Sequence, residues 1–264
     1  MNRLAMGLAL CALFALSLST ASPASSQWLK IPLPGTPRTP DGKPILTAPA
    51  PKTPDGKTDL SGIWRRDTPG VNYLVNLGAG GAEISMLPWA EALYKSRQEN
   101  LAKDRPSGRC LPHALPDAMM VSIFKITPTP GAMLILYEEF THFRQIFTDG
   151  RGLPNQANPE ERIGTWFGYS IGKWEGDAFV AETVGFNDKS WLDDTGHPHT
   201  DAMRVTERFR RRDFGHMEIE ITIDDPKTYT KPFTVKVAFA LLPDTEFIED
   251  ICDNEKDQPH MIGK

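Results

Sequence analysis

Beyond its N-terminus, this sequence has no apolar run long enough to cross a membrane as a helix. It also has no excess of basic residues. The formal net charge is −5 at pH 7, and the arginines of 208–212 are offset by nearby acids, so nucleic-acid binding is not supported. The chain contains no G-x-S-x-G elbow, P-loop or dinucleotide fingerprint, which argues against the enzyme classes that depend on these motifs.

The N-terminus has the features of a secretory signal peptide. Arg3 precedes the apolar segment 4–18, and small residues suited to cleavage follow it. We therefore predict a signal peptide over residues 1–26. The mature protein is expected to be exported, either periplasmic or secreted.

Cysteine is scarce, and the few cysteines are informative. The chain contains three, of which Cys11 lies in the apolar leader, leaving Cys110 and Cys252. In an oxidising compartment two such residues most simply form a disulfide. The alternative is a reactive thiol, but no cationic side chain beside Cys252 is present to lower its pKa. We expect a Cys110–Cys252 disulfide.

Proline marks off an N-terminal arm from a single domain. Residues 27–58 carry a near-repeat, TPDGKP at 39–44 and TPDGKT at 53–58. Pro-Asp-Gly is a turn signal, and we predict an extended arm that acts as a plain linker outside the core. The remainder, 59–264, is long enough for one domain with a sizeable core.

The domain is predicted to be mainly β. One helix is expected over 87–104, where Pro88 suits the first turn. Elsewhere an alternation of apolar and polar residues predicts strands near 59–67, 133–139, 142–150, 168–174, 178–186, 203–211, 216–224, 233–242 and 246–252. Because such a meander must protect its edges, we predict an antiparallel β-barrel of about eight or nine strands. A β-sandwich is the alternative.

Two glutamates share faces with apolar residues. Glu207 alternates in phase with Val205 and Phe209, and Glu182 with Val180, although the other face of that second strand is apolar too. A carboxylate inside a barrel is costly unless it is paired, and such groups cluster at functional sites.

Arg144 is the candidate partner for Glu207. It shares a strand face with His142 and Ile146, so it is expected to point inward as well. A buried Glu–Arg ion pair without chemistry is the alternative to a catalytic role for either residue.

The stretch HPHT offers two restrained imidazoles. His197 and His199 flank Pro198, and three interpretations stay open: acid–base chemistry, a metal site, or a hydrogen-bonded loop at the barrel rim. A metal needs three or more protein ligands. The further ligands would come from Asp194, His113, His142 or Glu207.

Several motifs together resemble a large family of exported bacterial proteins that are mostly uncharacterised. These are DLSGIW, CLP, FRQIFTDGR, GYSIGKWEGDAFVAETVGFND, WLDDTGHPHTDAMRVTERFRRRD and TIDDPKTYTKPFTV, within residues 59–255. The resemblance implies a lipocalin-like barrel. It also implies functional positions at Glu182, Glu207, Arg144 and Pro198–His199.

This chain departs from the family pattern at two histidines. It has GYS at 168–170 where members often have GHS, and DGRGLP at 149–154 where they often have DGRPHP. Those departures weaken the case for a metal site shared with the family.

The leading functional hypothesis is a cofactor-independent lyase, isomerase or dehydratase acting on a small apolar or aromatic molecule in the barrel cavity. Glu207 or Glu182 would be the base, His199 or His197 the acid, and Arg144 would hold an oxyanion. The predicted binding residues are Tyr169, Trp174, Trp191, His142 and Asp194. The alternatives are an exported binding protein for a small hydrophobic ligand, and a metal-dependent enzyme at His197 and His199.

Overall fold

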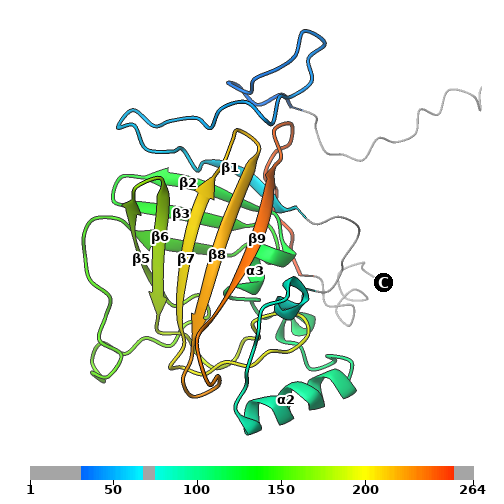
Figure 1. Cartoon of the computed structure of the whole chain (residues 1–264), viewed down its shortest axis with the longest axis vertical. Coiled ribbons are helices and arrows are strands. Elements are labelled where there is room, and N and C mark those ends of the chain that lie inside the picture. Colours follow the sequence, from blue (N-terminus) through cyan, green and yellow to red (C-terminus); the bar gives the residue numbers. More distant parts are fainter. Residues whose placement is uncertain (1–30, 68–74, 253–264) are drawn as a thin grey trace, which may run out of the picture.

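Nine strands close into one barrel, as the computed structural model shows for residues 31–67 and 75–252 (Figure 1). The predicted signal peptide and residues 27–30 of the arm lie outside these described residues. Strand order follows the sequence, and β1 pairs with β9, so the sheet has no open edge. The predicted barrel is confirmed, and the β-sandwich alternative is wrong.

The strands agree closely with the alternation in the sequence. They are β1 Gly62–Arg66, β2 Phe124–Thr129, β3 Ala132–Tyr137, β4 Phe143–Phe147, β5 Tyr169–Glu175, β6 Ala178–Val184, β7 Arg204–Arg211, β8 His216–Asp224 and β9 Phe233–Leu241. The strand β2 was not among those predicted. The strand expected at 246–252 is wrong, because β1 already closes the barrel against β9, and this segment makes only a bridge between Asp250 and Glu139.

The barrel is not antiparallel throughout, which corrects the prediction. β4 and β5 run parallel, because the long connection 148–168 returns the chain to the end of the barrel at which β4 began. Their register joins only two residue pairs, Ile146 with Ser170 and Phe147 with Ile171. We call this short junction the β4–β5 seam.

Large side chains fill the barrel. The inward residues of β8 are all apolar and buried, and those of β7 alternate between the apolar Val205 and Phe209 and the charged Glu207 and Arg211. The largest fully buried side chains are Trp64, Phe124, Phe179, Phe186, Phe209 and Phe239. The barrel centre is therefore a packed core rather than the open ligand cavity that the sequence interpretation assumed.

The predicted helix is present as α2, Pro88–Glu99, and it lies outside the barrel near one rim (Figure 1). It begins with proline at its first turn, as expected. A second short helix, α3, covers Asp117–Val121, and 3₁₀ turns cover Leu77–Gly80 and Pro106–Arg109. None of the helices in the described part of the chain is long and apolar enough to cross a membrane.

The N-terminal arm contacts the barrel, so the plain-linker interpretation is wrong. Each TPDGK repeat closes a tight turn, with Thr39 N donating to Lys43 O and Thr53 N to Lys57 O, both at 2.9 Å. The arm then crosses one end of the barrel (Figure 1). There Gly215 N donates to Leu46 O over 2.7 Å. These backbone hydrogen bonds fix the arm over the β7–β8 turn.

The predicted disulfide is confirmed. Cys110 and Cys252 are bonded, with their Cα atoms 5.5 Å apart and a sequence separation of 142. The C-terminal segment is also hydrogen-bonded to the β3–β4 connection, where Phe140 N donates to Asp250 O over 2.8 Å. The disulfide therefore links the segment before α3 to the end of the described chain.

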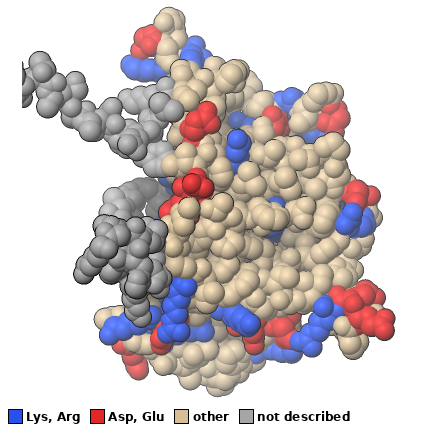
Figure 2. Space-filling view, turned by 180° about the vertical axis from the view of Figure 1, so that it is seen from behind, with Lys and Arg blue, Asp and Glu red and all other residues tan. Residues whose placement is uncertain are grey.

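Charge is unevenly distributed over the surface. In the view from behind, the acidic and basic side chains gather towards the two ends of the molecule, and the face between them is largely uncharged (Figure 2).

Candidate functional site

The predicted Arg144–Glu207 pair lies inside the barrel. An Nη2 of Arg144 on β4 donates to Oε2 of Glu207 on β7 over 2.5 Å, and the two side chains are 1% and 0% exposed. Both residues point inward because they occupy inward positions of their strands, as the alternation predicted. A fully buried ion pair persists only when further hydrogen bonds compensate its desolvation.

Two hydroxyls provide those hydrogen bonds. Arg144 Nε donates to Ser170 Oγ over 3.0 Å, and Nη2 donates to Thr183 Oγ1 over 2.8 Å. The hydroxyls are themselves 2.9 Å apart. Ser170 on β5 and Thr183 on β6 are buried, and the sequence interpretation did not identify them, since small hydroxyl residues are common at strand positions. We call Arg144, Glu207, Ser170, Thr183 and Tyr137 the barrel polar cluster.

This cluster has unused hydrogen-bonding capacity. In the described part of the chain, Arg144 Nη1, Glu207 Oε1 and the Tyr137 hydroxyl are buried without a hydrogen-bond partner. Burial raises the pKa of Tyr137 well above its usual value, so the phenol keeps its proton. Buried polar groups are nearly always satisfied by protein, water or ligand. Donor and acceptor capacity is therefore available in this cluster for water or a ligand group.

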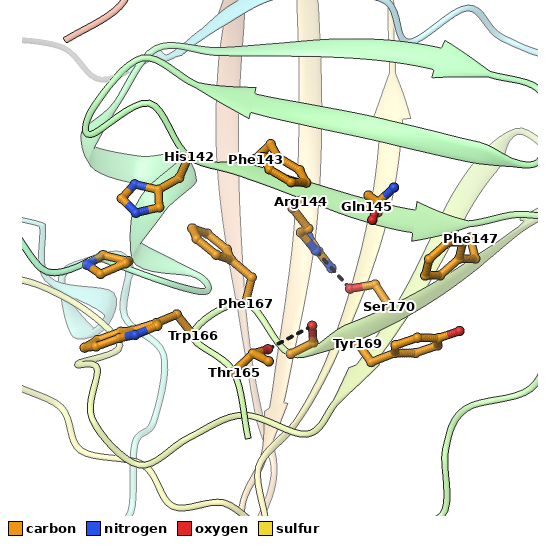
Figure 3. A pocket seen from close by; sticks show the side chains of 12 residues that line it. His142, Phe143, Arg144, Gln145, Phe147, Thr165, Trp166, Phe167, Tyr169 and Ser170 are labelled. Carbon is orange, nitrogen blue, oxygen red and sulfur yellow. Dashed lines mark hydrogen bonds between the residues drawn. The ribbon is translucent and has the colours of Figure 1, made fainter. Parts of the chain in front are cut away.

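A pocket opens at the β4–β5 seam, immediately outside this cluster (Figure 3). Its volume is about 580 Å³. Because β4 and β5 are paired over so short a length, the sheet leaves a gap beside the first half of β4. We call this the seam pocket. It is lined by Pro112, His142, Phe143, Arg144, Gln145, Phe147, Thr165, Trp166, Phe167, Gly168, Tyr169 and Ser170.

Aromatic rings dominate the pocket wall. Phe143 is 61% exposed at the pocket, so its ring offers apolar contact area to a ligand. Phe147 and Tyr169 face each other with ring centroids 5.1 Å apart. Arg151 lies over the Phe147 ring at 3.9 Å and donates to the Tyr169 hydroxyl over 3.2 Å. The aromatic surface is thus held in place at its outer edge.

Gly168 lets the chain enter β5 beside the pocket. Its φ is +67°, a conformation that favours glycine, and a Cβ there would lie 2.7 Å from the carbonyl oxygen of Val184. The tight approach brings Phe167 and Tyr169 to the pocket wall on either side of it.

His142 supplies the titratable imidazole of the pocket wall. Desolvation lowers the pKa of His142 below its ordinary value, so the ring is neutral at neutral pH. The side chain projects from the start of β4 near Phe167 (Figure 3). The predicted binding residues His142 and Tyr169 therefore lie in one pocket, together with Arg144.

The two histidines of the HPHT loop lie elsewhere. His197 is buried, donates through Nδ1 to Asp193 Oδ2 over 2.6 Å and stacks on Tyr94 of α2 with ring centroids 4.3 Å apart. His199 is also buried, and its Nε2 is 2.7 Å from Ser190 Oγ. Each imidazole is thus held by Asp193 and Tyr94 or by Ser190, and neither lines the seam pocket.

Asp193, which the sequence interpretation did not identify, organises that loop. One of its oxygens accepts from the backbone N–H groups of Thr195, Gly196 and His197, and the other accepts from Leu77 N over 2.8 Å. Burial alone would raise the pKa of Asp193, but the hydrogen bonds from His197 and these amides outweigh it and hold the pKa below the usual value. The rigid rim loop, one of the three interpretations, is the one the contacts bear out.

Two further predicted residues belong to the same loop. Trp191 is buried beneath the guanidinium of Arg97, which lies 4.3 Å from the ring centroid. Asp194 accepts from Arg105 over 2.7 Å and from Val75 N over 2.9 Å. Neither residue lines the seam pocket.

Glu182 and Trp174 do not line the pocket either. Glu182 is 37% exposed and pairs with Arg204 over 3.1 Å on the outside of the barrel, so its predicted interior position is wrong. Both faces of β6 carry apolar residues, and Phe179 on the opposite face is the one that enters the core. Trp174 packs edge-on against Phe179 near the β5–β6 turn.

One group of possible metal ligands lies among the described residues, and it does not include His197 or His199. In the described residues, the only group of three or more suitable side chains close enough to share an ion is His113, Asp117 and Asp194. Two of these three were named as possible ligands from the sequence, but Asp117 was not, and neither histidine of the HPHT loop takes part.

A scan against protein-family models finds no match to this chain, and a search of curated proteins finds none either. The family resemblance therefore remains a prediction from the motifs.

Proposed function

We propose that this chain is an exported protein that binds a small apolar or aromatic molecule in the seam pocket. The observation that carries the proposal is an aromatic-lined pocket set directly against a buried cluster with free hydrogen-bonding atoms. Ligand pockets usually combine an apolar wall with a few polar groups that orient the ligand, in a volume of roughly 300–1,000 Å³. The seam pocket, at about 580 Å³, lies in that range.

Export is supported by two independent features. The N-terminal sequence has the signal-peptide pattern, and the disulfide between Cys110 and Cys252 suits an oxidising compartment.

Acid–base catalysis in the same pocket is the second candidate. It is favoured by the free Oε1 of Glu207, which has no partner in the described residues, and by the neutral imidazole of His142 in the pocket wall. Binding is preferred because Glu207 lies behind Arg144 and does not line the pocket. The histidines first proposed as the acid are bound within the rim loop.

A matched pair of probes tests the binding proposal. Naphthalene and 2-naphthoate share one aromatic body, and only the second carries an acceptor for Arg144. Both are titrated by ligand-observed NMR against the wild type and Phe143→Ala. Loss of the ring is expected to weaken binding about 5- to 30-fold, from roughly 1–2 kcal/mol of lost apolar contact.

Leu93→Ala is the control, since Leu93 is an exposed apolar residue on α2 and does not line the pocket. It should leave both affinities unchanged. If neither probe binds the wild type, or if Phe143→Ala binds both as well as the wild type, the seam pocket is not the binding site.

Glu207→Gln separates binding from catalysis. In a binding protein, the folded variant keeps most of its affinity for 2-naphthoate. In an enzyme that uses this base, the variant binds a substrate but loses turnover.

A further inference from the structure

A second polar cluster lies apart from the seam pocket. His113 in the segment before α3, Asp117 at the start of α3 and Asp194 in the β6–β7 connection are each at most 9% exposed. One possible ligand atom from each lies within 4.8 Å of those of the other two. Two segments that are distant in sequence, 113–117 and the β6–β7 connection, therefore bring one imidazole and two carboxylates together in the interior. We call this the His113 cluster.

Its hydrogen bonds are incomplete. His113 Nδ1 is 2.5 Å from Asp117 Oδ2, and Nε2 is 3.1 Å from Glu139 Oε1. Asp117 Oδ1, however, is fully buried and has no hydrogen-bond partner in the described residues. Asp117 is 2% exposed, so water does not reach this oxygen from the surface. A buried carboxylate oxygen left unsatisfied is expensive, and it marks a missing donor or cation.

The local charge balance also favours a cation. Acidic groups around the cluster are Asp117, Asp193, Asp194 and Glu139. Arg105 binds Asp194 at 2.7 Å from a side chain that is one-third exposed, and Arg97 interacts electrostatically with Asp193. His113 and His197 are the imidazole partners of Asp117 and Asp193, at 2.5 Å and 2.6 Å. Carboxylates gathered in the interior are stabilised by a cation bound among them.

We propose that His113, Asp117 and Asp194 bind a divalent transition-metal ion, with Zn²⁺ the best match. One imidazole nitrogen and two carboxylate oxygens form a donor set that suits Zn²⁺, whereas Ca²⁺ and Mg²⁺ prefer oxygen donors alone. The ion takes the place of the proton shared by His113 and Asp117, and that proton leaves to solvent. Asp117 Oδ1 then gains the partner that it lacks.

The proposed ion lies close to one wall of the seam pocket. A very small cavity, lined by His113, Tyr137, Glu139, His142 and Phe167 among others, separates the His113 cluster from that pocket. His142 and Phe167 line both spaces. Fixing α3 and the β6–β7 connection to one ion therefore steadies the wall behind these two residues.

The experiment uses the disulfide-bonded chain, treated with chelator, dialysed and titrated with Zn²⁺ alone in a calorimeter. Metal content is measured in parallel by elemental mass spectrometry. The wild type should bind about one equivalent and melt at a higher temperature when loaded. Asp117→Asn, which keeps the shape of the side chain, should weaken the affinity at least about tenfold and abolish the thermal shift.

His216→Gln is the matched control. His216 and Asp213 form a similar imidazole–carboxylate contact of 2.7 Å, but at the half-exposed β7–β8 turn and outside the cluster. This variant should bind Zn²⁺ like the wild type. The proposal is overturned if the folded wild type binds no Zn²⁺, or if Asp117→Asn, shown to be folded by circular dichroism, binds it with unchanged affinity.

Discussion

The Arg144–Glu207 pair gives the strongest test of how this barrel is held together. The perturbation is Glu207→Gln, which preserves the volume of the side chain and removes its charge. The variant leaves the Arg144 guanidinium in the core, where its side chain is 1% exposed, with the neutral hydroxyls of Ser170 and Thr183 as its remaining neighbours. We expect the folded state to lose stability because the buried cation has lost its counter-charge.

The magnitude follows from the burial. Removing one partner of a buried ion pair costs about 3–5 kcal/mol, and the amide oxygen of the new glutamine keeps one neutral hydrogen bond, so the lower end applies. For a domain of this size each kcal/mol lowers the Tm by about 2–4 °C. A cost of about 3 kcal/mol thus corresponds to a drop of about 6–12 °C.

Urea unfolding followed by tryptophan fluorescence measures the effect. The double variant Arg144→Met with Glu207→Leu is the companion, since replacing a buried pair by apolar residues of similar size is often neutral or stabilising. It should be more stable than Glu207→Gln. The reasoning is refuted if Glu207→Gln lowers the free energy of unfolding by less than about 1 kcal/mol, or if the double variant is less stable than Glu207→Gln.

Three further predictions concern other parts of the chain. Desolvation lowers the pKa of His199 below its ordinary 6.5, so the unfolded state takes up a proton that the folded state does not. The stability contributed by neutral His199 is therefore fully present above about pH 6.5 and is lost as the pH falls below it, by up to about 1.4 kcal/mol per pH unit. Urea unfolding midpoints measured from pH 7 to 5 should depend less on pH in His199→Gln than in the wild type. Replacing both Cys110 and Cys252 by serine should cost about 2–5 kcal/mol in the same assay, and a loss below about 0.5 kcal/mol would contradict it. A Cβ at Gly215 would lie 2.4 Å from Leu46 Cβ, so Gly215→Ala should loosen the arm and speed its cleavage in limited proteolysis. Gly108→Ala, where a Cβ meets nothing within 4 Å, should be cleaved like the wild type.

Local pattern was sufficient for much of the barrel. Period-two alternation located most of the strands and placed Glu207 and Arg144 on inward faces, because the direction of a side chain in a strand follows from its parity. The alternation placed Glu182 on the wrong face, because both faces of β6 carry apolar residues and the sequence alone does not distinguish the inward one. It also could not indicate the parallel β4–β5 pairing, which depends on the path of the long connection 148–168 rather than on either strand.

The two polar clusters were only partly predictable for a different reason. Ser170 and Thr183 lie 26 and 39 residues from Arg144 in sequence, and Asp117 and Asp194 are separated by strands β2 to β6. Nothing in the composition around these residues distinguishes them from ordinary strand or helix-start positions. These residues come into contact only when the barrel closes. The contacts that define the candidate sites therefore depend on the order and pairing of the strands and not on the local sequence.

The central claim is that the seam pocket is the place where this chain binds a small aromatic molecule. The most direct measurement is a titration of the isotope-labelled chain with 2-naphthoate, followed by amide and methyl chemical shifts. The account predicts that the largest shifts fall on Phe143, Gly168, Tyr169 and Ser170, with little change on the exposed helix α2. Shifts that are confined to other parts of the protein, or no shifts in the presence of excess probe, would contradict it.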